Sequence, residues 1–414
     1  MKQKVRKVLL NLAKRHHFFM SLFRKLDSLY KHIKYFKFRF LKVNNKLIVF
    51  ESFLGSKYAD SPRAIYEYMM NNKKFSSYNF VWFFNDPDEY KFLEKNHNTK
   101  VLKYRSNDYF KYYAMAGYWI SNSRVYYGLK KKKGQKYVQC WHGTPLKRLG
   151  FDIKVTGGNA MNSVKDIRNK YQSDAAKYDY MVSPSKFVTD KYKSAFNLAN
   201  CNKSVKIIEK GYPRNDFLSN FSNSDIKRIK KELGINSNKK VILYAPTWRD
   251  DQHESGVGYV YQSPVDFDYL KERLSDKYII LFRAHYFVAN SFNFDKYKGF
   301  LYDVSDYSDI NDLYVISDLL ITDYSSVFFD YSILKRPIVF YMYDLDTYKG
   351  KLRDFYIDLH ELPGEIVQKE EDLVKVIEKS GKLSYNNKYK KFNDKFTYLE
   401  DGNATERVVT EIFE

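Results

Sequence analysis

The sequence predicts an α/β protein of two domains whose parallel sheets face a central cleft, preceded by a basic helical arm. Three observations support this fold class. From residue 46 onward, short apolar runs alternate with amphipathic stretches, which is the pattern of βα units in parallel sheets. The 414 residues are long for one domain and sufficient for two. The first 40 residues hold twelve Lys and Arg against one acid, Asp27, so this segment stands apart as an arm.

Six apolar runs in the first half of the chain are the expected strands of the first sheet. These runs are Lys46–Phe53, Tyr78–Phe84, Tyr118–Ser121, Lys136–Trp141, Tyr178–Ser183 and Val205–Lys210. We assign residues 46–225 to this N-terminal domain and residues 1–45 to the arm.

Five further runs are the expected strands of the second sheet, in a domain that we place at residues 226–414. These runs are Lys240–Pro246, Tyr278–Ala284, Gly299–Val304, Asp318–Asp323 and Pro337–Tyr341. Between the two series, Ser224 and Asp225 are expected to cap a helix that runs to about Leu233 and ends at Gly234. The interdomain boundary is therefore expected near residues 219–238, and a last helix is expected at Thr405–Glu414.

The arm carries about half of the formal net charge of +22. Its apolar residues recur at helical spacing between basic positions, and no uncharged apolar run reaches the ~18 residues that span a bilayer. A basic amphipathic helix suits an anionic membrane surface, and a solvated helix packed on its own domain is the alternative. Nucleic acid is a less favoured partner, because the aromatic residues are not interleaved with Lys and Arg on one surface.

Several chemistries are disfavoured by what the sequence lacks. Cys140 and Cys201 are too few for a disulfide framework or a thiolate metal site, and no cleavable secretory signal is recognisable, so we expect a reducing, cytosolic setting. Neither Gly157-Gly158 nor FLGSK at 53–57 has the spacing of a Walker or dinucleotide-binding loop, which argues against ATP hydrolysis and nicotinamide chemistry. The histidines show no metal-ligand spacing, and Asp250-Asp251 fits a solvated loop. We expect no metal and no cofactor.

Polar side chains follow five of the expected strands. His142, the segment 211–216, the segment Thr247–Asp250, the pair Arg283 and His285, and the segment Asp323–Ser326 each stand at a strand end. In open α/β sheets, ligands bind beyond the carboxyl ends of the strands. One such residue is usually structural, but five that open toward a shared cleft predict a functional site.

The contents of this site favour a phosphorylated ligand. Lys147 and the arginines 214, 249 and 283 recognise phosphate, and Ser325 and Ser326, at the start of an expected helix over Val327–Leu334, add hydroxyl and backbone donors. A diphosphate fits such a pocket. His142 has the pKa range of a general base, and Gly143, Thr144 and Pro145 after it allow close approach of the backbone.

Six motifs, in order, resemble the CDP-glycerol glycerophosphotransferase family, bacterial enzymes that prime and polymerise teichoic acids. They are WHGTPLKRLG at 141, SDAAKYDYMVSPSKFVTDKY at 173, EKGYPRND at 209, YAPTWRDD at 244, FRAHYF at 282 and ISDLLITDYSSVFFDYSILKRPIVFY at 316. An earlier stretch, FESFLGSKYADSPRAIYEYM from 50, is also similar to that family. The resemblance covers about residues 46–345.

The resemblance implies a GT-B-like pair of Rossmann-like domains, an acceptor domain followed by a CDP-donor domain. It also implies a CDP-glycerol or CDP-ribitol donor and an undecaprenyl-diphosphate-linked acceptor, at the cytoplasmic face of the membrane. His142 then falls on the family's proposed catalytic base and His285 on its second essential histidine. By the same resemblance, Tyr324, Ser325 and Ser326 lie in the donor pocket, with Arg283 nearby. Together with the residues at the strand ends, the expected substrate-binding residues are Gly143, Thr144, Lys147, Arg214, Thr247, Arg249, Arg283, Asp323, Tyr324, Ser325 and Ser326.

The resemblance suggests a direct displacement, in which His142 deprotonates the acceptor hydroxyl and CMP leaves from the donor. Several alternatives stay open at this point. Ribitol phosphate is an alternative to glycerol phosphate, and a single addition is an alternative to polymerisation, because only the basic arm precedes the two domains. A second hypothesis for an enzyme is a GT-B glycosyltransferase that uses a nucleotide sugar. A third hypothesis is a membrane-binding or nucleic-acid-binding protein whose cleft is inert.

Overall fold

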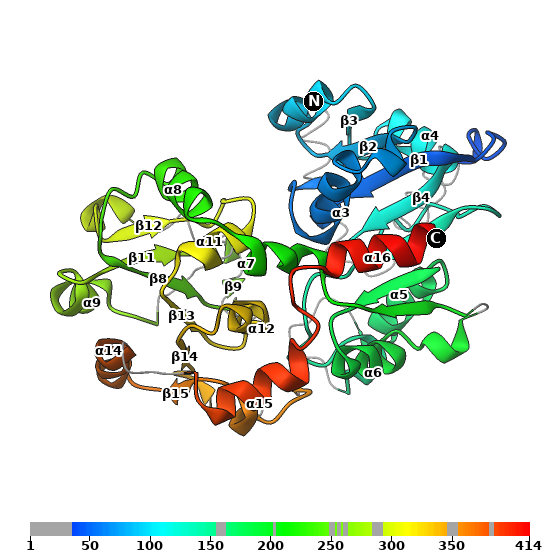
Figure 1. Cartoon of the computed structure of the whole chain (residues 1–414). Coiled ribbons are helices and arrows are strands. Elements are labelled where there is room, and N and C mark those ends of the chain that lie inside the picture. The colour runs from blue at the N-terminus through cyan, green and yellow to red at the C-terminus, as the bar shows by residue number, and fades with distance from the viewer. Residues whose placement is uncertain are drawn as a thin grey trace.

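The computed structural model describes residues 35–154, 163–201, 204–247, 253–254, 258–259, 264–283, 293–345, 355–380 and 385–414. Two parallel sheets with helices on their faces confirm the predicted fold class (Figure 1). The amphipathic helix expected in the arm falls on residues 1–34 and lies outside the described residues. Within the part of the chain that the structure describes, no helix is long and apolar enough to cross a membrane.

The first sheet has seven parallel strands in the order β3-β2-β1-β4-β5-β6-β7. Their bounds are β1 Asn44–Glu51, β2 Asn79–Phe84, β3 Thr99–Lys103, β4 Ala116–Ser121, β5 Lys136–Gln139, β6 Tyr180–Ser183 and β7 Lys206–Glu209. Only β3 was not predicted. It is an edge strand that carries lysines at both Lys100 and Lys103, so its apolar signal is weak.

Helices cover both faces of this sheet because successive side chains of a strand point to opposite faces. On β1, Leu47 and Val49 pack in one core, and Ile48 and Phe50 pack in the other. The helices on this sheet are α3 Asp60–Met70, α4 Asn107–Met115, α5 Val164–Ala175 and α6 Lys186–Ala195, whereas the next helix, α7 Asp216–Asn220, packs through Leu218 in the core of the second sheet. The short 3-10 helices are η1 Phe53–Gly55, η2 Lys73–Phe75, η3 Asp88–Lys95, η4 Gly150–Asp152, η5 Leu198–Asn200 and η6 Pro213–Asn215.

The second sheet has six parallel strands in the order β12-β11-β8-β13-β14-β15. Their bounds are β8 Lys240–Ala245, β11 Tyr278–Phe282, β12 Leu301–Asp303, β13 Leu319–Thr322, β14 Ile338–Tyr341 and β15 Glu365–Val367. The short edge strand β15 was not predicted. A separate antiparallel pair is formed by β9 His253–Glu254 and β10 Gly258–Tyr259.

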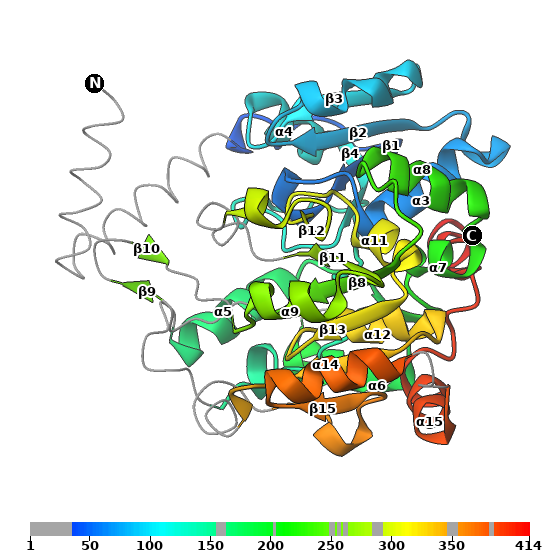
Figure 2. The same cartoon turned by 90° about the vertical axis from the view of Figure 1, so that its left-hand side faces the viewer.

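The helices of the second half lie on the two faces of this sheet (Figure 2). Helices α9 and α14 pack on one face, and α8, α11, α12 and α15 pack on the other. Their bounds are α8 Asn223–Glu232, α9 Phe267–Leu274, α11 Ile310–Ile316, α12 Val327–Tyr331, α14 Glu370–Lys379 and α15 Asn387–Phe396. The 3-10 helices are η7 Phe294–Tyr297, η8 Ser332–Leu334 and η9 Leu359–Glu361.

The cap of α8 differs from the prediction by two residues. Ser222, not Ser224, is the N-cap, and it forms a capping box with Asp225 at the third helical position. The reciprocal pair needs this three-residue spacing, which Ser224 does not have. The C-terminal end is as predicted, because Gly234, with φ of +66°, follows the C-cap Leu233.

The last helix corrects the expected division of the chain. Helix α16, Ala404–Phe413, packs on the first sheet, where Val408, Val409 and Ile412 join the core that contains Ile48 and Phe50 (Figure 1). The carboxylate of Asp216 accepts hydrogen bonds from the first two backbone amides of α16, at 2.8 and 2.7 Å. The C-terminal helix therefore belongs to the first domain. The sequence did not predict this, because an amphipathic pattern shows that a helix packs on a sheet but not on which sheet.

A buried arginine joins the two domains. Arg214, on η6, forms ion pairs with Asp60 of the first domain at 3.3 Å and with Asp330 on α12 of the second domain at 3.0 Å. The side-chain amide of Asn311 also donates to the carbonyl oxygen of Arg214, at 2.5 Å. Because Arg214 is only 6% exposed, these carboxylates are compensated by a cation that water does not screen.

We expect Arg214→Gln to lower the free energy of unfolding by about 3–5 kcal/mol, because it leaves two buried carboxylates without their cation. The matched control is Arg228→Gln, which removes an exposed arginine that pairs with Glu232 and Asp225 on α8 and is expected to cost about 0–1 kcal/mol. Urea unfolding followed by tryptophan fluorescence measures both. Equal losses in the two variants would contradict the assigned role of Arg214.

Candidate active site

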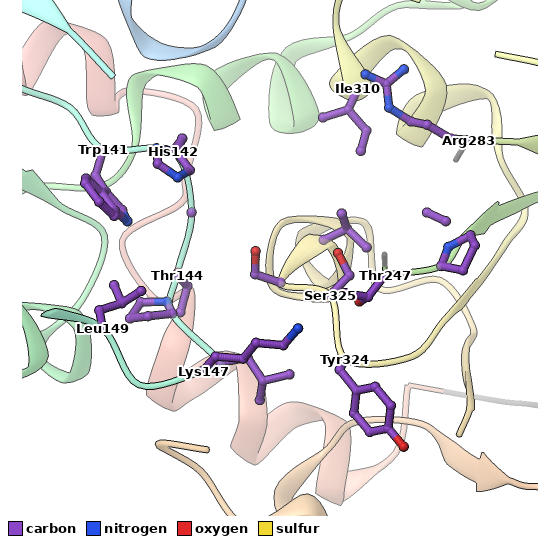
Figure 3. A pocket seen from close by; sticks show the side chains of 17 residues that line it. Trp141, His142, Thr144, Lys147, Leu149, Thr247, Arg283, Ile310, Tyr324 and Ser325 are labelled. Carbon is purple, nitrogen blue, oxygen red and sulfur yellow. The ribbon is translucent and has the colours of Figure 1, made fainter. Parts of the chain in front are cut away.

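A cleft of about 440 Å³ lies between the domains at the carboxyl ends of their strands. Residues 141–147 and 149 form its wall in the first domain, and residues 245–247, Arg283, Ile310 and 324–327 form the wall in the second domain (Figure 3). The cleft lies where the polar residues at the strand ends predicted it. A strained turn after β5 shapes the first wall, and a buried carboxylate holds the second.

The first wall depends on a strained turn directly after β5. Trp141 has φ of +52°, which is costly for a bulky residue and persists only where the surroundings enforce it. The Trp141 ring packs edge-on against Phe196, with ring centroids 4.9 Å apart. Its backbone N–H donates to the side-chain oxygen of Gln139 at 2.8 Å.

Gln139 connects this turn to the neighbouring strand end. It is fully buried, and its amide nitrogen donates to the carbonyl oxygen of Ser123 at 3.1 Å and to the hydroxyl of Tyr137 at 3.0 Å. Ser123 follows Asn122, the residue that binds the imidazole of His142. Gln139 therefore fixes both the turn that carries His142 and the loop that orients its ring.

The orientation of His142 leaves one ring nitrogen for chemistry. Its Nδ1 lies 2.9 Å from the carbonyl oxygen of Asn122. Since a carbonyl only accepts, Nδ1 carries the proton in the neutral ring and Nε2 keeps its lone pair. The ring stacks on Trp141, with centroids 4.4 Å apart, and its remaining surface is accessible from the cleft.

The protein around His142 favours the neutral form of the ring. Burial lowers its pKa below the ordinary 6.5, while the Asn122 carbonyl and the nearby Asp60 oppose this shift and Arg214 adds to it. A neutral imidazole with a free Nε2 accepts a proton from a hydroxyl nucleophile. The first wall is thus suited to general-base chemistry.

The second wall is organised by Asp323, which lies beneath the cleft rather than in it. Its Oδ1 accepts hydrogen bonds from the backbone amides of Thr247 at 2.8 Å and Tyr324 at 2.6 Å, and the residue is 2% exposed. Asp323 therefore holds together the ends of β8 and β13 and is not among the residues that line the cleft. Thr247, Tyr324, Ser325 and Ser326 line the cleft as expected.

Tyr324 is fixed by contacts on its far side. Its hydroxyl donates to Asp344 at 3.1 Å, and its ring stacks on Phe355, with centroids 5.8 Å apart. The helix after Ser326 is shorter than expected: α12 ends at Tyr331 and the 3-10 helix η8 follows. The helix dipole expected at this end of the cleft is therefore that of a short helix, and Ser325 and Ser326 line the cleft at its start.

The walls approach one another closely at Gly143. A Cβ atom at this position would lie 3.1 Å from the Oγ of Ser326 across the cleft, so glycine is favoured where the domains meet. Thr144 lines the same wall and is 2% exposed. The ammonium of Lys147 points into the cleft in Figure 3, and Arg283 lines the opposite side.

Arg214 is a correction to the expected phosphate-binding set, because its guanidinium is buried in the ion pairs with Asp60 and Asp330. Arg249 and His285 lie outside the described residues. Sequence reasoning missed Gln139 and Asn122, although Asn122 follows β4 and the strand-end argument extends to it. Among the described residues, no three His, Cys, Asp or Glu side chains lie together as a metal site.

The model of one protein family, CDP-glycerol:poly(glycerophosphate) glycerophosphotransferase, matches residues 33–414. The chain is 40% identical over 371 residues to a teichoic acid poly(glycerol phosphate) polymerase of Bacillus spizizenii, covering 89% of this chain and 92% of the relative. It is also 40% identical over 400 residues to a teichoic acid glycerol-phosphate transferase of Staphylococcus aureus, covering 94% and 98%. The chain spans about half the length of the related polymerase of Bacillus subtilis (49%).

A teichoic acid poly(ribitol-phosphate) polymerase of Bacillus spizizenii is more distant, at 31% identity over 405 residues, covering 94% of this chain and 60% of the relative. Among solved structures, the wall teichoic acid polymerase TagF matches with a TM-score of 0.83 and 37% identity, covering 95% of this chain and 96% of the solved chain. This match confirms the GT-B-like arrangement expected from sequence.

We expect Gln139→Leu to release His142 from its fixed tautomer and to lower the pKa of the ring further, because the hydrogen bond to the Asn122 carbonyl raises that pKa. The substitution removes the acceptor of the Trp141 amide and leaves buried polar groups unsatisfied, at a cost of about 1–3 kcal/mol each. Nitrogen NMR of ¹⁵N-histidine-labelled protein, titrated with pH, reports both tautomer and pKa.

The control is Gln172→Leu, which removes a glutamine of α5 that bonds to Asn197 and Asn200 instead. His142 is expected to titrate as in the wild type in this variant. An unchanged His142 titration in folded Gln139→Leu protein would remove Gln139 from its positioning role.

Proposed function

The chain belongs to the CDP-glycerol:poly(glycerophosphate) glycerophosphotransferase family, and on that premise we propose how its cleft performs the transfer. The protein is an enzyme of teichoic acid synthesis that transfers glycerol phosphate from CDP-glycerol and releases CMP. The observation that supports our assignment of roles is the position of His142, which lines the same cleft as Thr247, Arg283, Ser325 and Ser326 of the second domain.

The second domain is the proposed donor side. Ser325 and Ser326 supply hydroxyl and amide donors, Thr247 lies at the end of β8, and Arg283 supplies a cation. Such groups neutralise the charge that develops on a diphosphate as its phosphorus–oxygen bond breaks. His285, by the family resemblance, and Arg249, by its charge at a strand end, are proposed to join this side, His285 as a proton donor or as a phosphate ligand.

The first domain is the proposed acceptor side. Nε2 of His142 takes the proton of the terminal acceptor hydroxyl, and the oxygen attacks the phosphorus that is bonded to glycerol. The bond from that phosphorus to the bridging oxygen breaks, and CMP carries away the electron pair. Lys147, on the same loop as His142, is placed to hold an acceptor phosphate.

The relatives favour glycerol over ribitol as the polyol. The two glycerol-phosphate relatives are 40% identical to this chain, and the ribitol-phosphate relative is 31% identical. The acceptor is proposed to be lipid-linked, with an undecaprenyl diphosphate anchor. The family holds both single-addition enzymes and polymerases, so product length decides between these two outcomes.

We expect CMP release from CDP-glycerol in the presence of a synthetic lipid-linked acceptor, slower release from CDP-ribitol and no turnover of UDP-sugars. His142→Gln is expected to lower kcat/KM by about 10²–10⁴-fold, because the general base is lost. His360→Gln, which changes an exposed histidine of η9, is the matched control and should keep full activity. Mass spectrometry of the product reports the polyol and the number of additions.

The pH profile checks the same assignment. A base must be unprotonated to act, and the pKa of His142 lies below 6.5, so the acid limb of kcat/KM is expected below pH 6.5 in the wild type. Turnover of UDP-sugars alone, or full activity of His142→Gln, would overturn the proposed reaction.

We also propose that the enzyme binds the membrane through a surface that continues the arm. Phe36, Phe40 and Leu41 are 54%, 75% and 36% exposed, and the guanidinium of Arg39 lies over both phenylalanine rings. The basic loop 130–133 is tied to this segment, since the hydroxyl of Tyr35 donates to the Lys130 carbonyl and Lys132 donates to the Leu41 carbonyl. Exposed aromatic residues beside lysines suit an anionic bilayer surface.

The double variant Phe36→Ser/Phe40→Ser is expected to weaken binding to phosphatidylglycerol vesicles at least several-fold, because two apolar side chains no longer enter the bilayer. Co-sedimentation with phosphatidylglycerol and with phosphatidylcholine vesicles, at low and high salt, measures this. Tyr398→Ser removes another exposed ring (47% exposed) and serves as control. Equal binding by the double variant and the wild type would contradict the proposed surface.

A further inference from the structure

Residues 53–60, which connect β1 to α3, have an unusual backbone conformation. None of them has a role in the proposed reaction. Phe53, Leu54, Gly55 and Asp60 all have positive φ, at 47°, 58°, 76° and 66°. Three of these four are not glycine, so this conformation is costly and must be enforced by its surroundings. Strain of this kind is found where a side chain has to be presented in one place.

Hydrogen bonds hold the loop in this conformation. The backbone amide of Phe53 donates to the side-chain oxygen of Asn122 at 2.8 Å, and Asn122 is also the residue whose carbonyl binds His142. The hydroxyl of Ser52 donates to the carbonyl oxygen of Ala59 at 2.9 Å and closes the loop at its base. The loop is therefore rigidly related to the catalytic wall, and Lys57 projects from it.

Lys57 reaches across to the second domain and meets Arg283 there. Its ammonium donates to the carbonyl oxygen of Tyr307 at 2.9 Å and approaches that of Asp306 at 3.4 Å. The guanidinium of Arg283 donates to the same Tyr307 oxygen, also at 2.9 Å, and to the carbonyl oxygen of Val304. Two cations from different domains thus share one neutral acceptor, at the side of the cleft that Arg283 lines.

Neither cation forms an ion pair with a carboxylate among the described residues. Asp309 is paired with Arg63 at 3.4 Å, and Asp306 contacts Lys57 through its backbone carbonyl. Burial and the charge of Arg283 lower the pKa of Lys57 to about 8, and burial lowers the pKa of Arg283, while Asp306 and Asp309 act on both in the opposite direction. Two partly buried like charges that no carboxylate of the described residues pairs with are unfavourable until an anion joins them.

We propose that Lys57 and Arg283 form an anion site that binds phosphate oxygens of the reactants at this edge of the cleft. This inference rests on the proposed function and adds to it a cation from the acceptor domain. A phosphate oxygen accepts charge-assisted hydrogen bonds from both groups and relieves their repulsion. Because one cation comes from each domain, the site is complete only when the domains face each other across the cleft.

The anion has two possible sources, the diphosphate of the donor and a phosphodiester of the acceptor. Pyrophosphate is the probe for the chemistry that they share, because its binding does not depend on the identity of the donor. Calorimetric titration of wild type, Lys57→Met and Lys57→Arg with pyrophosphate measures the site. Lys57→Met is expected to raise the Kd at least about tenfold, the loss of one charge-assisted hydrogen bond, and Lys57→Arg to restore most of the affinity.

The matched control is Lys239→Met, which removes an exposed ammonium that also donates to a carbonyl, that of Ser275, at 2.6 Å. It should leave the Kd unchanged. The Kd of CDP-glycerol and the KM of the lipid-linked acceptor then separate the two sources, since the substrate that Lys57 binds is the one weakened in Lys57→Met. An unchanged pyrophosphate Kd together with a lower melting temperature would reduce Lys57 to an interdomain contact and overturn the proposal.

A measurement on the wild type covers the case in which Lys57→Met does not fold. Lysine NMR, assigned with Lys57→Arg, follows the titration of the Lys57 ammonium without and with pyrophosphate. Anion binding is expected to raise its pKa above the value of about 8, and an unchanged pKa at saturating pyrophosphate would overturn the site. A wild type that binds pyrophosphate through Lys57 but does not turn over CDP-glycerol would refute the proposed function and leave this site standing.

Discussion

The buried guanidinium of Arg214 is the interaction on which the arrangement of the cleft depends. It pairs with Asp60, which acts on His142, and with Asp330, which lies on the helix that follows Ser326. One cation thereby fixes the wall that carries His142 relative to the wall that carries Ser326. A buried ion triad contributes little net stability compared with apolar packing, but it is highly specific, because any other relative position of the domains leaves a charge uncompensated.

Each wall of the cleft is held by a buried polar side chain that binds backbone groups. On the first wall, the amide of Gln139 holds a strained turn, and the Asn122 carbonyl selects the tautomer of His142. On the second wall, the carboxylate of Asp323 holds the ends of two strands. In both cases a buried polar side chain satisfies backbone groups next to the cleft, so that the groups facing the ligand are oriented before it binds.

The sequence predicted most of the strands because a buried parallel strand reads as a continuous apolar run. It missed β3 and β15, which lie at sheet edges, where one strand carries lysines and the other is three residues long. His142, Thr247, Arg283 and Ser325 were predicted to meet because each follows a strand, and all four line the cleft. Arg214 and Asp323 were also predicted to bind substrate, but their side chains turn inward and bind protein groups.

The sequence by itself determined the α/β class, the place of the cleft and the family, because apolar periodicity and motif order are local properties of the chain. Only the tertiary structure decided which charged side chains and which packing surfaces meet. Arg214 became the link between domains, α16 returned to the first sheet, and Lys57 met Arg283 across 226 positions of the sequence. The reason is physical: the partner of a polar side chain depends on the loops that packing brings together, and that information is absent from any single segment.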